Sequence, residues 1–477
     1  MPLPNYRTKI VATIGPASES PEMLERLIRA GLSIARLNFS HGDFAGHAER
    51  ITQIRAAAQA AGRRVVIMAD LPGPKMRIGK LEPESIHLVA GESFTLTTDD
   101  IVGNLKRVSM SFQRLPQVVK PGDRLFLNDG LVQLVVQSSH GTDVHCKVAV
   151  GGELRSRKGL NLPRIHLGIS AFTDHDRACL EWALGNGVDA VSQSFVESAA
   201  DIEAVRAAAK AMGKQPFIIA KIERSDALEN FDEILQAADG IMVARGDLGV
   251  EVPIEEIAVL QKQLIAKANL AGKPVITATQ MLESMTTSRL PTRAEATDVA
   301  NAILDGTDCI MLSGESAMGK YPEEAVSMLA RIAAHTEAHR PLKHLRVTKA
   351  PSKPSTAAEA VASVVEHSLE TVTCAAVFVP TRSGSTVRMI SRCRPTAWVV
   401  AVSSDADICQ SLEFSYGVHP VQVNNYPENW SDFSRQWLSD HQLTGAIAFL
   451  VAGPSADNPD ANYRIEFIRT GARHEEN

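Results

Sequence analysis

The sequence predicts an α/β protein: a (β/α)8 TIM barrel, interrupted by a small inserted β-barrel domain and followed by a separate α/β domain. Three observations support this fold class. Eight short apolar runs end in polar or glycine-rich residues, and amphipathic segments separate most of them. Between residues 71 and 190 this alternation stops, and segments rich in valine, threonine and turn residues replace it. Beyond residue 345 a second alternation of strand and helix patterns begins.

The eight apolar runs fit the strands of one barrel, because most of them lie about 20 to 35 residues apart, close to the length of one βα unit. Helix patterns between them, at Pro21–Gly31, Ile202–Met212 and Glu255–Leu270, have apolar residues recurring on one face. We assign residues 1–71 and 169–340 to the barrel. The runs are Lys9–Gly15, Ile34–Ser40, Val65–Leu71, Ala190–Phe195, Phe217–Glu223, Gly240–Gly249, Pro274–Met281 and Cys309–Ser316.

Residues 72–168 predict an all-β domain inserted after the third barrel strand. Strand patterns occur at Ser93–Asp100, Asp123–Gly130, Leu131–Val136 and Val144–Val150. The tripeptide Asn-Asp-Gly at 128–130 is typical of a hairpin turn. Because the insertion follows the end of a barrel strand, it is attached at the rim where such strands end, and we expect it to act as a lid.

Residues 345–477 predict a further α/β domain, which follows the barrel through a stretch rich in Pro, Lys and Ser (Pro341–Ser355). Helix patterns at Ala357–Glu370 and Ser385–Arg392 alternate with strand patterns at Ala375–Pro380 and Ala397–Ser403. This alternation is typical of parallel βα units.

The first strand of this last domain leads into a polar turn that opens a helix. Backbone amides at a helix start, together with hydroxyls and an arginine, suit a phosphate group. A helix cap formed by Ser383 or Ser385 alone is the alternative. We expect a regulatory domain that binds the phosphate of an effector through Thr381, Arg382, Ser383, Gly384, Ser385 and Thr386.

Composition excludes several classes of protein. The net charge of −6 does not favour nucleic acid or an anionic membrane as a partner. Six scattered cysteines form no close CxxC pair, which argues against a zinc site and a disulfide scaffold. The N-terminus has no apolar signal segment, and no apolar run reaches the roughly 18 residues of a membrane span. We expect a cytoplasmic protein with free thiols.

Lys221 and Glu223 are the most informative pair in the chain. They follow the apolar stretch Phe217–Ala220, and side chains two residues apart on a strand share a face. Burying either charge alone is costly, so such a pair is tolerated where it binds a metal or a charged substrate. A structural ion pair is the alternative.

Other polar residues follow the remaining predicted strands. Active sites of (β/α)8 barrels lie at the carboxyl ends of their strands, so we expect these residues to form one pocket. Its charges would suit a divalent cation that bridges an anionic, phosphorylated substrate. The residues are Arg36, Asn38, Ser40, His41, Asp70, Asp247, Thr277, Thr279, Ser313 and Glu315.

At these residues the sequence resembles the pyruvate kinase family over the whole chain. Long motifs occur in the family's order: Arg7–Pro16, Arg36–Gly42, Ile218–Glu223, Met242–Gly249, Thr277–Met281, Pro291–Glu295 and Met311–Glu315. The resemblance implies transfer of the phosphoryl group of phosphoenolpyruvate to ADP, which yields pyruvate and ATP in glycolysis.

The resemblance also implies roles for individual residues. Glu223 and Asp247 correspond to the Mg²⁺ (or Mn²⁺) ligands. Lys221 would neutralise the transferring phosphoryl group and the enolate, and Arg36 would hold the phosphoryl group. The amides around Gly246 and Asp247, with Thr279, would bind the substrate carboxylate. Thr279, Ser313 and water remain candidates for the proton donor to the enolate.

Nucleotide contacts are implied for Asn38, His41, Arg77 and Lys158, and closure of the lid would bring Lys158 to the phosphates. A homotetramer and activation by a sugar phosphate are implied as well. The identity of the effector stays open.

The potassium site of many family members corresponds to Asn38, Ser40, Asp70 and a threonine that follows the aspartate. Here Leu71 stands in place of that threonine, and Lys75 stands where potassium-requiring members have glutamate. We therefore expect an enzyme that does not require K⁺ and in which the Lys75 ammonium substitutes for the cation.

Two alternatives stay open at this point. One is another Mg²⁺-dependent barrel enzyme that acts on enolates, such as a lyase or an aldolase of 2-oxo acids, which would not need Lys158 or the nucleotide positions. The other is a catalytically silent metabolite sensor, although Lys221, Glu223, Asp247 and Thr279 are all present.

Overall fold

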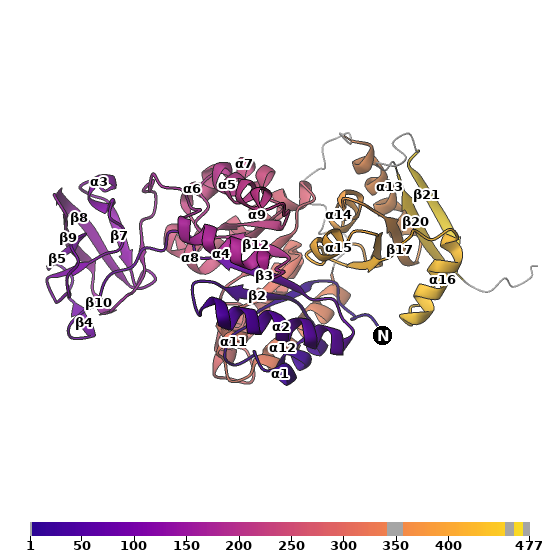
Figure 1. Cartoon of the computed structure of the whole chain (residues 1–477), viewed down its shortest axis with the longest axis horizontal. Helices are drawn as coiled ribbons and strands as arrows, with labels where there is room; N and C mark the ends of the chain where they lie inside the picture. The colour runs from indigo at the N-terminus through magenta and orange to yellow at the C-terminus, as the bar shows by residue number, and fades with distance from the viewer. Residues whose placement is uncertain (1, 341–355, 454–461, 471–477) are drawn as a thin grey trace, which may run out of the picture.

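The computed structural model describes residues 2–340, 356–453 and 462–470, which form three parts arranged in a row (Figure 1). The inserted β domain lies at one end, the barrel in the middle and the C-terminal α/β domain at the other end. The stretch Pro341–Ser355 and, within the assignment 345–477, residues 345–355, 454–461 and 471–477 lie outside the described residues.

The central part is a closed barrel of eight parallel strands in the order β1-β16-β15-β14-β13-β12-β3-β2, which confirms the predicted fold class. Each strand is short and almost wholly buried, as expected where helices cover the outer face. The strands are β1 (Lys9–Thr13), β2 (Leu32–Asn38), β3 (Val66–Leu71), β12 (Ala190–Gln193), β13 (Phe217–Ile222), β14 (Gly240–Ala244), β15 (Val275–Ala278) and β16 (Cys309–Leu312).

Helices pack around this barrel through one apolar face each. In α1 (Pro21–Ala30), Leu24, Leu27 and Ile28 are buried, Ser20 caps the first turn and Gly31 ends the helix. The others are α2 (Phe44–Ala61), α4 (Asp174–Gly185), α5 (Ala199–Ala211), α6 (Ser225–Glu229), α7 (Phe231–Ala237), α8 (Arg245–Glu251), α9 (Ile257–Leu270), α10 (Arg293–Asp305), α11 (Gly314–Ala317) and α12 (Pro322–Ala338), with 3₁₀ turns at Ile254–Glu256 and Glu283–Thr286.

Most predicted strand runs extend beyond the observed strand, and two of them reach into a following helix. The run Gly240–Gly249 leaves the sheet after Ala244 and continues as α8, and the run Cys309–Ser316 ends at Leu312, shortly before α11. The pairing of β14 with β15 stops at Ala244, so the backbone beyond it satisfies its hydrogen bonds by turning into a helix. Because of this change of conformation, polar residues at the rim lie in the first turns of short helices.

The inserted part consists of a six-stranded and a two-stranded sheet that share one apolar core. The hairpin prediction at 128–130 is confirmed: β7 and β8 pair antiparallel, and Asn128, Asp129 and Gly130 all have positive φ. Its elements are β4 (Ser85–Leu88), β5 (Ser93–Thr97), β6 (Arg107–Ser109), α3 (Leu115–Val118), β7 (Arg124–Leu127), β8 (Val132–His140), β9 (Asp143–Val150), β10 (Gly152–Arg155) and β11 (Leu160–Asn161).

The C-terminal part is a five-stranded sheet in the order β19-β18-β17-β20-β21, in which only β21 is antiparallel to its neighbour. Two apolar clusters lie on its two faces. Its elements are α13 (Ala357–Thr371), β17 (Cys374–Pro380), α14 (Ser385–Ser391), β18 (Trp398–Ser403), α15 (Ala406–Leu412), β19 (Val418–Gln422), α16 (Trp430–Asp440), β20 (Ile447–Ala452) and β21 (Arg464–Arg469).

The C-terminal part is joined to the amino ends of the barrel strands. Phe414 belongs to the apolar cluster of the barrel interior and stacks on Phe217, with ring centroids 5.0 Å apart. Beside it, the buried Arg394 donates to both carboxylate oxygens of Asp308, at 2.8 and 2.9 Å, and to Asn269 Oδ1 at 2.5 Å. A stacked pair of aromatic rings and a bidentate ion pair therefore hold the two parts together.

All six cysteines are free, as the sequence predicts, and Cys146, Cys179, Cys309 and Cys409 are buried. Burial raises the pKa of the Cys146 thiol to about 12, so this thiol is unreactive near neutral pH. Within the described part of the chain, every helix is too short or too polar to cross a membrane.

Replacement of Arg394 by Met will leave the buried Asp308 carboxylate without its partner. We expect a loss of about 3 to 5 kcal/mol in the stability of the unit that contains this interface, because an uncompensated buried charge remains. Urea unfolding should show a clearly lower midpoint. The control Arg435→Met removes the exposed pair with Asp432 and should leave the midpoint nearly unchanged; equal midpoints for the two variants would contradict this account of the interface.

Candidate active site

The predicted pocket residues of the barrel lie at one rim, because all eight strands are parallel and end there. Arg36 and Asp70 lie on the neighbouring strands β2 and β3, and Lys221 lies on β13. All three residues are buried. The rim therefore brings two cations and a carboxylate into the barrel mouth.

Asp70 joins the two cations. Arg36 Nε donates to Asp70 Oδ2 at 2.9 Å, and a second guanidinium nitrogen contacts the same oxygen. The other oxygen, Oδ1, accepts from Ser192 Oγ at 2.7 Å and lies 3.4 Å from Lys221 Nζ. Burial opposes ionisation of Asp70, but Lys221 and Arg36 outweigh it and lower its pKa to about 2. Asp70 is thus a carboxylate at any physiological pH.

Lys221 is held from three sides. Its ammonium donates to Ser194 Oγ at 2.6 Å and lies 3.4 Å from both Asp70 Oδ1 and Glu223 Oε2. Burial works against the charged form, but Asp70 and Glu223 outweigh it and raise the pKa of Lys221. The pair predicted from the sequence therefore exists as a fixed, charged group at the barrel mouth.

Glu223 has one oxygen that the protein leaves unsatisfied. Its Oε1 accepts from the Phe195 amide at 2.7 Å, whereas the buried Oε2 accepts no hydrogen bond. Burial, opposed by Lys221 and reinforced by Asp247, raises the pKa of Glu223 to about 7. Asp247 is exposed in the first turn of α8, and its negative charge is close enough to raise the pKa of Glu223. Two carboxylates, one with a buried oxygen that accepts no hydrogen bond and lies 3.4 Å from Lys221 Nζ, fit the oxygen-rich environment that a divalent cation prefers.

Thr279 adopts a strained backbone conformation beside the start of α8. Its φ of +68° is unfavourable for a β-branched residue and is therefore a sign of a functional position. Its Oγ1 accepts from the Gly246 amide at 2.7 Å and donates to the Ala278 carbonyl at 2.6 Å. Ser313, which precedes α11 on the same rim, donates its amide to Glu315 Oε2 at 2.8 Å.

Asn38, Ser40 and His41 form a tight turn at the end of β2. Asn38 Oδ1 accepts from the Ser40 amide at 3.1 Å, and the Asn38 carbonyl accepts from the His41 amide. Burial, Lys75, Arg77 and Arg36 all lower the pKa of His41, so the imidazole faces a positive region. Lys75 is near enough to Asp70 for the negative charge of the carboxylate to favour the charged form of the lysine and so raise its pKa, but no ion pair joins the two among the described residues.

Arg77 and Lys158 lie together where the inserted domain joins the barrel. Arg77 bridges to Gly159 and donates to the Arg157 carbonyl at 3.0 Å, and the Lys158 carbonyl accepts from Ile78. The positive charge of Arg77 lowers the pKa of both His41 and Lys75. Among the described residues, no hydrogen bond or ion pair connects the Lys158 side chain to the barrel mouth.

Comparison with known proteins identifies this arrangement. The model of the pyruvate kinase barrel domain matches residues 5–326, and the model of the pyruvate kinase alpha/beta domain matches residues 359–448. The chain is similar to a pyruvate kinase of Thermococcus litoralis, with 50% identity over 91% of both chains.

The chain belongs to the pyruvate kinase family.

Two further similarities extend this result. Human pyruvate kinase PKLR is 44% identical over 90% of this chain and 78% of its own length. A solved structure of a pyruvate kinase from Cryptosporidium parvum has a TM-score of 0.91 at 36% identity and covers 98% of this chain and 97% of its own. The family consists of phosphotransferases and is generally metal-dependent, so the match supports neither the lyase or aldolase alternative nor the silent sensor.

The effector turn predicted for this pyruvate kinase family member lies at the start of α14. Gly384 has a φ of +75°, and its amide donates to Thr381 Oγ1 at 2.9 Å. Ser383 and Ser385 are exposed, and the Ser383 hydroxyl accepts from the Ser385 amide at 3.4 Å. Gly384 is the N-cap residue of α14, which begins without a side-chain capping hydrogen bond, and the turn presents the polar groups of Ser383 and Ser385 to solvent.

Sequence reasoning missed three residues that orient the charged groups. Ser192 and Ser194 contact Asp70 and Lys221, and Thr13 Oγ1 accepts from Arg36 Nη1 at 2.8 Å. The signal for the two serines was present, because Ser192-Gln-Ser194 repeats the two-residue spacing of Lys221 and Glu223 at the end of a predicted strand.

Proposed function

We propose that this protein transfers the phosphoryl group of phosphoenolpyruvate to ADP, giving pyruvate and ATP in glycolysis, in the cytoplasm. One observation carries the proposal: a buried ammonium, Lys221, is fixed between two carboxylates at the barrel mouth, next to a carboxylate oxygen that has no hydrogen-bond partner. In a chain of this family, that arrangement supports charge neutralisation during phosphoryl transfer.

In the proposed reaction, Arg36 and Lys221 bind the phosphoryl group and neutralise its charge while it passes to ADP. Phosphoryl transfer requires little covalent chemistry from the protein and depends on position and charge. Asp70 fixes both cations before substrate arrives, so their orientation costs little during the reaction. Lys221 would also stabilise the enolate that forms when the phosphoryl group leaves.

Glu223 and Asp247 would hold a divalent cation, Mg²⁺ or Mn²⁺, because the unsatisfied Oε2 of Glu223 is a suitable oxygen ligand. When bound, the ion would neutralise negative charge on substrate oxygens. The substrate carboxylate would lie against the amides of Gly246 and Asp247 at the start of α8, beside Thr279.

For the proton that converts the enolate to pyruvate, the geometry favours Ser313 or a water over Thr279. The Thr279 hydroxyl already donates to the Ala278 carbonyl at 2.6 Å. The Ser313 hydroxyl takes part in no hydrogen bond with the described residues, and Ser313 lies on the same rim.

ADP would bind between the barrel and the lid, through Asn38, His41, Arg77 and Lys158. The position of Arg77 supports this binding mode, because Arg77 is close enough to His41 for its positive charge to lower the pKa of the imidazole. Lys158 lies beyond it on the inserted domain, so the proposal requires the lid to close before the Lys158 ammonium reaches the phosphates.

We further propose that the enzyme does not need K⁺. Leu71 is fully buried and offers no oxygen beside Asn38, Ser40 and Asp70. Lys75 is close enough to Asp247 and Asp70 for these carboxylates to raise its pKa, although burial, Arg77 and Lys221 lower it overall. The ammonium thus supplies the positive charge that a bound K⁺ would supply.

Regulation by a sugar phosphate at Thr381, Arg382, Ser383, Gly384, Ser385 and Thr386, and assembly as a homotetramer, complete the proposal. The turn is separated from the active site by the barrel. However, Arg388 of α14 donates to the Ser383 carbonyl at 3.1 Å and lies 5.5 Å from the Phe217 ring, at the start of the strand that carries Lys221. This contact offers a physical route between the two places.

Substitution of Lys221 by Met should lower kcat on the order of 10²-fold or more, because a charge that stabilises the transition state is lost while substrate still binds. A coupled assay of pyruvate formation with Mg²⁺ measures this. Lys267→Met, which removes an exposed pair with Asp232, serves as the control. A near-normal kcat in folded Lys221→Met enzyme would reject the role.

Removal of K⁺ should change the initial rate less than tenfold when a bulky quaternary ammonium ion replaces it. A K⁺ placed 4 Å from the Lys75 ammonium would be repelled by about 4 kcal/mol at an effective dielectric constant of 20. The double variant Leu71→Thr/Lys75→Glu should gain a dependence on K⁺. A wild-type rate that falls tenfold or more without K⁺ would show that Lys75 does not replace the cation.

Replacement of both Ser383 and Ser385 by Asp should abolish activation by a sugar phosphate, because negative charge would occupy the place of the phosphate. Rates at subsaturating phosphoenolpyruvate, measured across a panel of sugar phosphates, test this. The exposed Ser439→Asp on α16 is the control. Activation that is unchanged in the double variant would place the effector elsewhere.

A further inference from the structure

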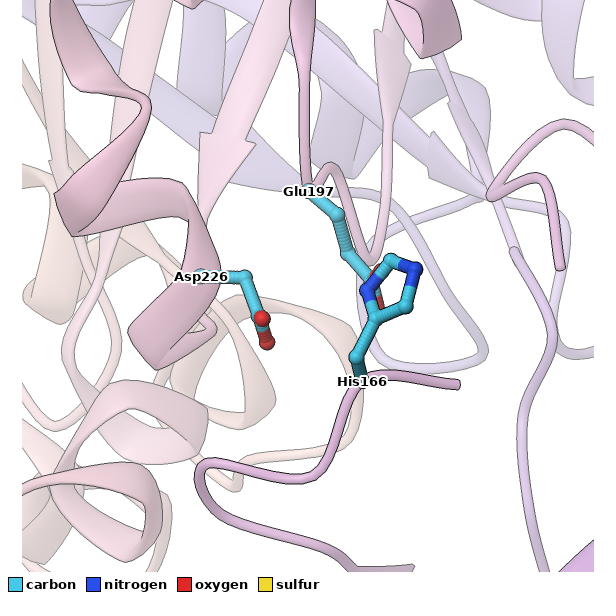
Figure 2. Close-up of side chains that lie close together, drawn as sticks. All are labelled: His166, Glu197 and Asp226. Carbon is cyan, nitrogen blue, oxygen red and sulfur yellow. The ribbon is translucent and has the colours of Figure 1, made fainter. Parts of the chain in front are cut away.

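A second group of charged side chains lies where the inserted domain returns to the barrel (Figure 2). His166 belongs to the segment that leads from β11 back to α4, Glu197 to the loop between β12 and α5, and Asp226 to α6. One ligand atom from each residue lies within 4.8 Å of the others. Figure 2 shows His166 and Glu197 next to each other, with the Asp226 carboxylate across from them.

The contacts within this group are close but incomplete. His166 Nδ1 lies 3.1 Å from Glu197 Oε2, and Arg224 Nε lies 3.1 Å from Glu197 Oε1. Arg224 also donates to Asp226 Oδ2 at 3.0 Å. Nevertheless, Glu197 Oε1 accepts no hydrogen bond, and Arg224 Nε donates none. Glu197 is only 6% exposed, so water does not readily satisfy this oxygen.

The charges are also unbalanced. Arg224 brings one positive charge to the two carboxylates of Glu197 and Asp226, and a neutral imidazole adds none. A buried carboxylate that is incompletely compensated favours an additional cation. The His166 side chain is 74% exposed, so a dissolved ion can reach the group from solvent.

We propose that His166, Glu197 and Asp226 bind a divalent transition-metal ion of the Zn²⁺ class. One imidazole nitrogen with two carboxylate oxygens is a ligand set that Zn²⁺ accepts, whereas Mg²⁺ prefers oxygen ligands alone. Ligand bonds of about 2.0 Å in tetrahedral geometry place neighbouring ligand atoms about 3.3 Å apart. The 3.1 Å between His166 Nδ1 and Glu197 Oε2 is close to that value.

This site shares no residue with the magnesium ligands proposed above, and it does not depend on the proposed reaction. Its three ligands come from three separate segments, one of which is the covalent connection between the lid and the barrel. A bound ion would therefore tie the connection on which movement of the lid depends to Asp226, which lies three residues after Glu223.

Equilibrium dialysis of the full-length protein against Zn²⁺, with metal analysis and millimolar Mg²⁺ throughout, tests the site. Wild-type protein should bind Zn²⁺ at least tenfold more tightly than His166→Ala. His367→Ala, which removes another exposed histidine near a carboxylate, should bind like wild type. His166→Cys should restore binding, since a thiolate is also a zinc ligand. Equal affinity of wild type and His166→Ala would overturn the proposal.

Hydrogen exchange gives a readout that does not depend on activity. Zn²⁺ should slow exchange of the backbone amides in residues 164–169 of the wild type and of His367→Ala, and leave their exchange in His166→Ala unchanged. Identical exchange with and without Zn²⁺ in the wild type would show that no ion restrains this connection.

Discussion

The arrangement of the active site depends on one buried carboxylate. Asp70 holds Arg36 through one oxygen and approaches Lys221 through the other, so two cations share a single partner on the strand between them. Burying three charges is costly unless each is paired, and breaking such a group leaves a charge without compensation. The closed barrel makes the group possible, because β2 and β3 are neighbours and β12, which supplies Ser192, lies next to β3.

The remaining structure can be understood from this constraint. Glu223, the second carboxylate beside Lys221, has a buried oxygen that accepts no hydrogen bond, and Asp247 at the start of α8 is close enough to raise the pKa of Glu223, so the rim can accommodate a further cation. The opposite end of the barrel is closed by Phe414 and fixed by the Arg394–Asp308 pair. A barrel held in this way presents its charged rim toward the lid, which is the side from which ADP would arrive.

The sequence allowed much of this to be predicted. Short apolar runs with polar ends identified all eight barrel strands, and residues such as Lys221 and Glu223 could be placed on one rim because parallel strands end together. Strand ends were less predictable: at Ala244 the chain turns into α8, since the pairing with β15 stops there. The positive φ of Thr279 leaves no sequence signal, because threonine normally avoids it. The group of His166, Glu197 and Asp226 could not be found either, since its members are about 30 residues apart and meet only through the fold.

The kinetic behaviour of Asp70→Asn tests most directly whether one carboxylate positions both cations. An amide of similar shape keeps the packing but removes the charge that holds Arg36 and Lys221, and misplacement by about 1 Å can cost on the order of 10²-fold in rate. We expect that kcat for pyruvate formation from phosphoenolpyruvate and ADP falls at least tenfold in variant enzyme that remains folded by circular dichroism. A folded Asp70→Asn enzyme with the kcat of the wild type would contradict this expectation.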